Sequence, residues 1–100
     1  MAFRLAFATE AKDQLRSLEL GKNRKDLVRL MKVRKCLALL QQNPRHPGLQ
    51  SHEFHSMSRE VGRKVFVVYV ESKTPSAWRV FWHYGPGKEE ITIVAITPHP

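Results

Sequence analysis

The stretch SAWRVFWHYG, residues 76–85, holds the side chains best suited to chemistry. Successive side chains of a β-strand point to opposite faces, and the apolar face of Trp78 and Trp82 predicts the buried side of a sheet. Arg79, Phe81 and His83 then lie on the other face. A guanidinium on a rigid strand can bind a phosphate, an aromatic ring can stack on a base, and an imidazole can exchange a proton. The pattern predicts a nucleic-acid phosphate site centred on Arg79, with an exposed arginine paired to a cross-strand carboxylate as the alternative.

Two more basic side chains could join Arg79 at a phosphate site. Lys64 begins the preceding predicted strand, and if its side chain points to the same face as Arg79, it lies across from the Arg79 strand. Arg63, next to Lys64, adds positive charge there. The chain contains no Ser-His-Asp or Cys-His pattern and no phosphate-binding glycine loop. We expect no metal site, because no cysteine or carboxylate completes a ligand pattern with the loop histidines His46, His52 and His55. Arginine, lysine and histidine alone suit a reaction in which the substrate supplies its own nucleophile.

The charge balance is the most informative property of the composition. The 100 residues include 17 Lys and Arg against 9 Asp and Glu, a formal net charge of +8. This excess predicts attraction to a polyanion, either nucleic acid or a strongly acidic protein.

The longest apolar run, residues 65–70, is far shorter than the ~18 residues that span a bilayer. The start of the chain does not have the pattern of a signal peptide, so we expect a cytoplasmic protein without membrane contact. We expect Cys36, the single cysteine, to be a small buried apolar side chain.

The elements that position these residues can be read from periodicity and turn signals. The pattern predicts a strand over residues 3–8, a helix that begins at Thr9 and ends at Gly21, and a helix capped by Asn23 that ends near Asn43. Residues 43–62 are predicted as mostly loop, followed by strands over 64–71, 77–84 and 90–96. We therefore predict an α+β fold, a two-layer sandwich in which a helical hairpin covers one face of a four-stranded sheet. The N-terminal strand and a three-stranded antiparallel meander make that sheet, and its other face is expected to be open.

Several short motifs resemble the RelE/ParE superfamily of bacterial toxins from type II toxin–antitoxin systems. The similarity rests on NPRHPGL after the second helix, on GRKVFVVYV, on AWRVFW, and on a last strand that runs into ITPHP. It covers nearly the whole chain in element order and implies one RelE-like domain over residues 1–100. RelE-type members of that family cut messenger RNA on the ribosome without a metal, and ParE-type members poison DNA gyrase.

The resemblance implies roles for individual residues. Arg79 matches the arginine that binds the scissile phosphate, Lys64 matches the first of two strand lysines, and His99 falls where the family has an Arg or His after its final strand. These three would be catalytic. We expect the RNA contacts to be made by Arg63, His83, Phe81 and His52.

The function expected from this similarity is that of a metal-independent endoribonuclease that needs no cofactor and cleaves mRNA on the ribosome through the RNA 2′-hydroxyl. Its expected protein partner is a small acidic antitoxin. Phe66 stands where the family has its second lysine. Two alternatives therefore stay open, namely a ParE-like inhibitor that binds gyrase and an inactive basic interaction module of the same fold.

Overall fold

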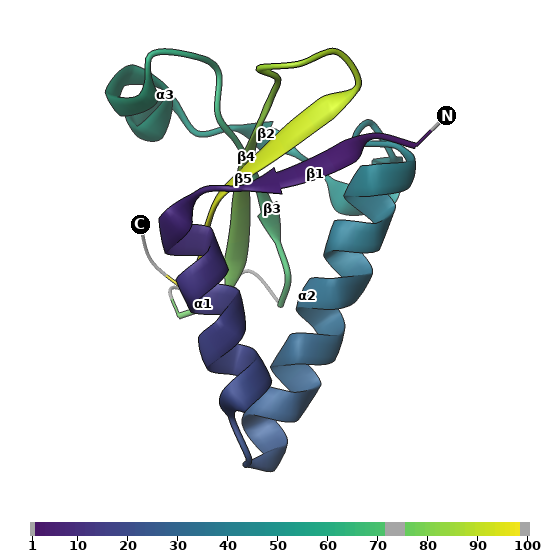
Figure 1. The fold of residues 1–100 in the computed structure, drawn as a ribbon, viewed down its shortest axis with the longest axis vertical. Coiled ribbons are helices and arrows are strands. Elements are labelled where there is room, and N and C mark those ends of the chain that lie inside the picture. Colours follow the sequence, from purple (N-terminus) through teal and green to yellow (C-terminus); the bar gives the residue numbers. More distant parts are fainter. Residues whose placement is uncertain (1, 72–75, 99–100) are drawn as a thin grey trace.

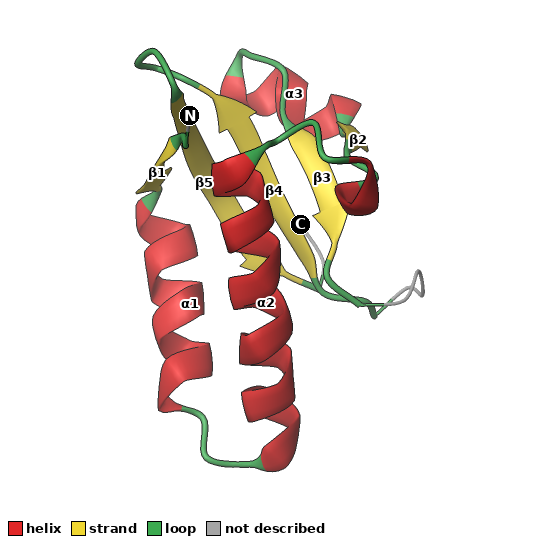
Figure 2. Cartoon of the chain, turned by 90° about the vertical axis from the view of Figure 1, so that its right-hand side faces the viewer, coloured by secondary structure: helices red, strands yellow, loops and turns green. Residues whose placement is uncertain are grey.

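The computed structural model describes residues 2–71 and 76–98, and in it two long helices lie against one face of a mixed sheet (Figures 1 and 2). The elements in chain order are β1 (Arg4–Phe7), α1 (Thr9–Leu20), α2 (Arg24–Gln42), the 3₁₀ turn η1 (Pro47–Leu49), β2 (His52–Glu53), α3 (His55–Val61), β3 (Phe66–Tyr69), β4 (Arg79–Tyr84) and β5 (Glu90–Thr97).

The sheet has five strands in the order β1-β5-β4-β3-β2. β1 runs parallel to β5, and the other neighbouring strands are antiparallel. The predicted α+β class and the β3-β4-β5 meander are confirmed. The prediction of four strands is wrong, because His52 and Glu53 pair with Val67 and Phe66 and add a fifth strand. This short strand satisfies backbone groups that would otherwise stay unpaired at the β3 edge.

The helical hairpin follows its predicted signals closely. The Asn23 side chain accepts a hydrogen bond of 2.8 Å from the Asp26 N–H and caps α2 as expected. The helix ends at Gln42, immediately before Asn43 and Pro44. Leu27 and Met31 of α2 are apolar but 50% and 70% exposed, because the far end of the hairpin extends past the sheet (Figure 2). No helix within residues 2–71 and 76–98 has both the length and the apolar character needed to cross a membrane.

The main core lies between the hairpin and the sheet. Trp82 is 1% exposed and packs in one cluster with Val80, Leu40 and other buried residues of α2 and β5. The Phe66 ring stacks on Trp82 with 4.9 Å between ring centroids. Cys36 belongs to this core, as predicted. Burial raises the pKa of its thiol to about 12, so the thiol stays protonated and unreactive at neutral pH.

A second apolar cluster covers part of the opposite face, so the prediction that this face is open is wrong there. Met57 of α3 packs in this cluster with Val67, Phe81 and Ala95 from three strands. The segment of α3 was expected to be loop, because its seven residues bury only Met57 and show no helical apolar stripe. A helix this short forms through its packing rather than through intrinsic propensity.

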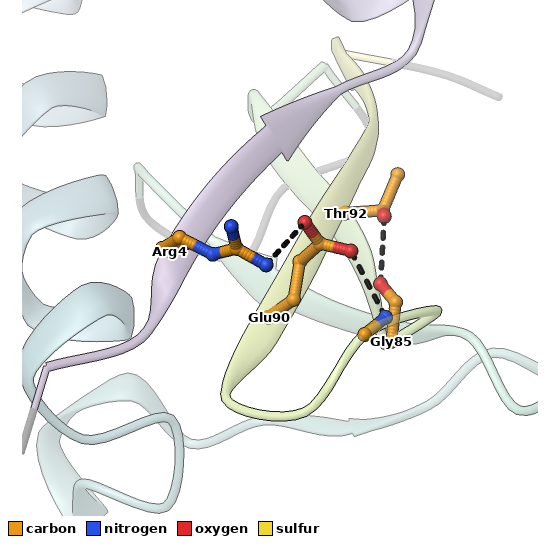
Figure 3. A network of polar contacts seen from close by, with 5 residues as sticks. Arg4, Gly85, Glu90 and Thr92 are labelled. Atoms are coloured by element: carbon orange, nitrogen blue, oxygen red, sulfur yellow. Dashed lines mark hydrogen bonds and ion pairs between the residues drawn. The ribbon is translucent and has the colours of Figure 1, made fainter.

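The loop between β4 and β5 is held by Glu90 (Figure 3). The Glu90 carboxylate accepts a hydrogen bond of 3.0 Å from the Gly87 N–H and pairs with Arg4 of β1 at 3.4 Å. The Thr92 hydroxyl donates to the Gly85 carbonyl at 2.8 Å, and Gly85 has a φ of 83°, which favours glycine. These contacts fix the turn between the two strands that the sequence predicts over residues 77–84 and 90–96.

The segment before β4 is held by Glu71. Its carboxylate accepts hydrogen bonds from the Trp78 N–H at 3.1 Å and from Arg29 Nε at 3.2 Å, and the Arg29 guanidinium lies 4.8 Å from the centre of the Trp78 ring. Burial acts to raise the pKa of Glu71. The two hydrogen bonds and the charges of Arg29 and Lys32 outweigh it, so the pKa lies below its ordinary value. Because Arg79 follows Trp78 directly, these contacts also set where the β4 strand begins.

Replacing Glu71 with glutamine is expected to lower the free energy of unfolding by about 1 kcal/mol at neutral pH, since a charge-assisted hydrogen bond is lost. The folded-state pKa of Glu71 is lowered. Its stabilisation is therefore complete above the unfolded-state pKa and is lost as pH falls through the folded-state value. Urea denaturation of both proteins should show the difference shrinking from about pH 5 downwards.

Glu19→Gln is the matched control for this measurement. Glu19 pairs with Arg34 at 3.2 Å on the surface, where the two side chains are 44% and 60% exposed. An exposed pair of this kind contributes less than about 1 kcal/mol. A Glu71→Gln effect that persists unchanged at acidic pH would contradict the assigned carboxylate contacts.

Candidate functional site

Arg79 is the first residue of β4, the central strand of the described sheet, so it lies at one end of that strand but not on an edge strand. In register it is opposite Tyr69 of β3 on one side and Thr97 of β5 on the other. The next residue, Val80, belongs to the core under the helices, so alternation places Arg79 on the face turned away from the hairpin. The predicted orientation of Arg79 relative to Trp82 is therefore confirmed. Arg79 is half-buried, so its backbone is held firmly while part of its side chain reaches solvent.

Arg79, Tyr69 and His52 form a row across three neighbouring strands. The Arg79 guanidinium carbon lies over the Tyr69 ring, 4.9 Å from its centroid. On the other side the His52 imidazole stacks on Tyr69, with centroids 6.1 Å apart and an angle of 20° between the planes. A cation over an aromatic face is attracted by the negative potential of the ring, which restricts the guanidinium to one position. We refer to these three residues as the Arg79–Tyr69–His52 row.

The Arg79 guanidinium has unused hydrogen-bonding capacity. Its Nε atom is buried and has no hydrogen-bond acceptor among residues 2–71 and 76–98. A buried polar donor without a partner costs free energy, and a ligand oxygen is one way to satisfy it. A planar guanidinium binds two oxygens of a phosphate at once, so this position is chemically suited to a phosphodiester.

Phe81 and His83, expected as RNA contacts on this same face, are not accessible. Phe81 is 0% exposed because the second cluster packs around it, with the Phe54 ring 5.3 Å from its own. It presents no surface on which a base can stack. His83 is 8% exposed, and its Nδ1 lies 2.9 Å from the Tyr84 carbonyl oxygen. Only the Arg79 end of this strand remains available for a ligand.

Lys64 and Arg63 are exposed but lie far from Arg79. β3 is antiparallel to β4, so Tyr69 meets Arg79 while the residues before Phe66 lie near the far end of β4. Lys64 precedes Tyr69 by five positions and lies just before β3, roughly 16 Å away along an extended chain. Alternation also places Lys64 on the side of Phe66, which faces the helices. The structure therefore does not bring Lys64 to the Arg79–Tyr69–His52 row, and Arg63 donates instead to the Tyr84 carbonyl at 3.2 Å.

His99 and Tyr69 differ from the other candidate residues in what the structure says of them. His99 lies outside the described residues. Tyr69 was missed as a site residue, although in KVFVVYVE it shares parity with Val67, which packs on the same face as Phe81. Tyr69 becomes a candidate only when it is known to pair with Arg79. That pairing is set by the register of β3 against β4, which the local sequence pattern does not specify. Within the described part of the chain, no three His, Cys, Asp or Glu side chains gather as a metal-ligand group.

The chain was also compared with known proteins. No protein-family model, no curated protein and no solved structure matches it. The features of the chain that bear on function are the Arg79–Tyr69–His52 row and the net charge of +8.

Proposed function

We propose that this protein is a RelE-like toxin, an endoribonuclease that cleaves mRNA in the cytoplasm, on the ribosome, without a metal. The observation that carries the proposal is the environment of Arg79, a half-buried arginine at the start of the central strand. Its guanidinium is held over Tyr69, and its buried Nε has no acceptor among the described residues. A net charge of +8 supports attraction to RNA. The same positive charge supports a small acidic antitoxin as the partner that binds this basic protein and inhibits it in the cell that makes both.

The proposed reaction uses the RNA itself as the nucleophile. The 2′-oxygen attacks the adjacent phosphorus and loses its proton, a new 2′-O–P bond forms, and the P–O5′ bond breaks. The departing 5′-oxygen takes up a proton, so the products are a 2′,3′-cyclic phosphate and a 5′-hydroxyl. Negative charge increases on the non-bridging phosphate oxygens in the transition state, where Arg79 would stabilise it.

Proton transfer requires a second type of group. His52 is exposed and stacks on Tyr69, so it stays a proposed contact to the RNA strand beside Arg79 rather than the group that transfers the proton. His99 stays a proposed proton donor or acceptor from the family resemblance. We assign no role at the scissile phosphate to Lys64, because it lies toward the opposite end of the sheet.

One observation favours a non-enzymatic alternative. Phe66 occupies the position of the family's second lysine, and its ring packs on Trp82 instead of facing a substrate. With Lys64 also distant, Arg79 is the one cation of the row. A single cation suffices to bind an anionic segment of a partner protein, and a ParE-like inhibitor of gyrase would need no more.

The two functions are separated by one set of assays on the purified protein. Translating ribosomes are given an mRNA with normal riboses or with 2′-O-methyl groups at the mapped cleavage positions, and gyrase supercoiling is measured in parallel. The expected result is cleavage of the normal mRNA, cyclic phosphate ends, no cleavage at methylated positions and unaffected gyrase, because methylation removes the nucleophile. Inhibited supercoiling with intact mRNA would instead establish the gyrase alternative.

A further inference from the structure

A pocket of about 600 Å³ opens on the side of the sheet that faces the helices, away from the Arg79–Tyr69–His52 row. The segment that follows α2 forms one wall, through residues 44–47 and 50–51. The other wall consists of Phe66 on β3 and of Trp82 and Tyr84 on β4. A volume of this size is typical of sites for small organic ligands.

The strand wall of this pocket is aromatic. The Phe66 and Trp82 rings stack with centroids 4.9 Å apart, and the Tyr84 ring meets Trp82 edge-on at 5.0 Å. Tyr84 is 41% exposed, so the aromatic surface continues from the buried core to solvent. Such a wall favours a flat, unsaturated ring, which gains stacking and dispersion contacts over its whole face.

Two polar atoms in the pocket-lining residues have no partner. Trp82 Nε1 and Ser51 Oγ are both buried, and neither has a hydrogen-bond partner within residues 2–71 and 76–98. The indole N–H can only donate, whereas the hydroxyl can donate and accept. A ring that fits this pocket should therefore carry hydrogen-bonding groups of both kinds on its edge, as the nucleobases do and hydrocarbon or phenyl rings do not.

The mouth of the pocket is positively charged. Arg45 lines it and is exposed, and Arg63 lies beside it through its hydrogen bond of 3.2 Å to the Tyr84 carbonyl. Two acidic residues lie near the wall by register, and both have partners. The Glu53 carboxylate, opposite Phe66, lies 3.3 Å from His55 Nδ1, and the Glu90 carboxylate pairs with Arg4 at 3.4 Å. The two arginines leave a cationic surface at which an anionic substituent of the ring would be bound.

We propose that this pocket binds a nucleotide, with its base against the wall of Phe66, Trp82 and Tyr84 and its phosphate toward Arg45. The face of the base lies on the Phe66 and Tyr84 rings, and its edge meets the Trp82 indole N–H and the Ser51 hydroxyl, which have no partner among the described residues. This site lies on the opposite face of the sheet from Arg79, and it stands independently of RNA cleavage. A free mononucleotide and a single base of an RNA strand share this chemistry, so both are ligands of the same site.

Intrinsic fluorescence offers a direct test, because Trp82 forms part of the wall. The full chain carrying Trp78→Phe, so that Trp82 is the one remaining tryptophan, is titrated with AMP, GMP, CMP and UMP, with a short single-stranded RNA, with inorganic phosphate and with the non-indole compound N-acetyl-phenylalaninamide, and the emission is corrected for absorption by each titrant. We expect saturable quenching by at least one mononucleotide and weaker binding at higher salt. If the short RNA that contains the same base also quenches Trp82, the pocket accepts that base in an RNA strand as well as in a free mononucleotide.

Variants locate the binding and separate it from the proposed cleavage. Ser51→Ala should weaken nucleotide binding about tenfold, through one lost hydrogen bond, without changing the melting temperature. Tyr84→Ala should also weaken it, whereas Arg79→Ala should bind as the parent does. The proposal is overturned if no nucleotide quenches saturably up to about 10 mM, if phosphate alone gives the same response, or if Ser51→Ala and Tyr84→Ala both bind normally. Tighter binding of N-acetyl-phenylalaninamide than of any nucleotide also overturns it, in favour of an aromatic side chain of a protein partner.

Discussion

Replacing Arg79 with alanine is expected to reduce RNA cleavage by about 10²- to 10³-fold, the usual loss when a donor to a developing anionic centre is removed. The variant should fold normally, since the Arg79 Nε makes no hydrogen bond within the described structure whose loss would destabilise it. Arg79→Lys should be intermediate, because lysine keeps the charge but lacks the planar fork and its contact with the Tyr69 ring. The measurement is the rate of appearance of cyclic phosphate ends on ribosome-bound mRNA.

Arg34→Ala supplies the matched control for this experiment. It removes the same charge from an exposed position on α2, where Arg34 pairs with Glu19. Loss of general attraction to RNA should therefore be equal in the two variants, and only the Arg79 variant should lose the chemical step. If Arg79→Ala cleaves RNA as fast as Arg34→Ala, Arg79 does not contact the reacting phosphate.

Truncating the two buried aromatic residues of β4 should destabilise the fold strongly and to a similar degree. Trp82 is 1% exposed in the core under the helices, and Phe81 is 0% exposed in the second cluster on the opposite face. Trp82→Ala and Phe81→Ala should each lower the free energy of unfolding by about 3 to 5 kcal/mol, because each leaves a cavity that the rigid sheet cannot close. For a domain with a total stability of about 5 to 15 kcal/mol, either change leaves the native state marginal.

Urea denaturation of the two variants tests the burial of both sheet faces. Tyr84→Ala, at an aromatic position that is 41% exposed, provides a comparison and should cost clearly less. The Phe81 variant is the informative one. If it is nearly as stable as the wild type, α3 does not cover this face, and the open surface predicted from the sequence pattern is the correct description.

The local pattern of the sequence was sufficient for the elements whose signals lie within a few neighbouring residues. Asn23 caps α2, the helix ends before Pro44, and the alternation in AWRVFWHY separates Val80 and Trp82 from Arg79 correctly. Each of these outcomes depends on backbone geometry or on a period of two, which short windows of sequence already contain. The same information sufficed to single out Arg79 as the candidate centre of the site.

Only the tertiary structure decided what covers each face and which side chains meet. Whether Phe81 is open or buried depends on Met57, which is distant in sequence and belongs to a helix too short to show a pattern. The register of β3 against β4 places Tyr69 beside Arg79, and the antiparallel direction sends Lys64 toward the other end. Registers and layer contacts arise from packing between remote segments, whose free energy is shared among many residues rather than concentrated in one motif. For this reason the sequence by itself singled out the arginine of the candidate site, and folding alone determined its neighbours.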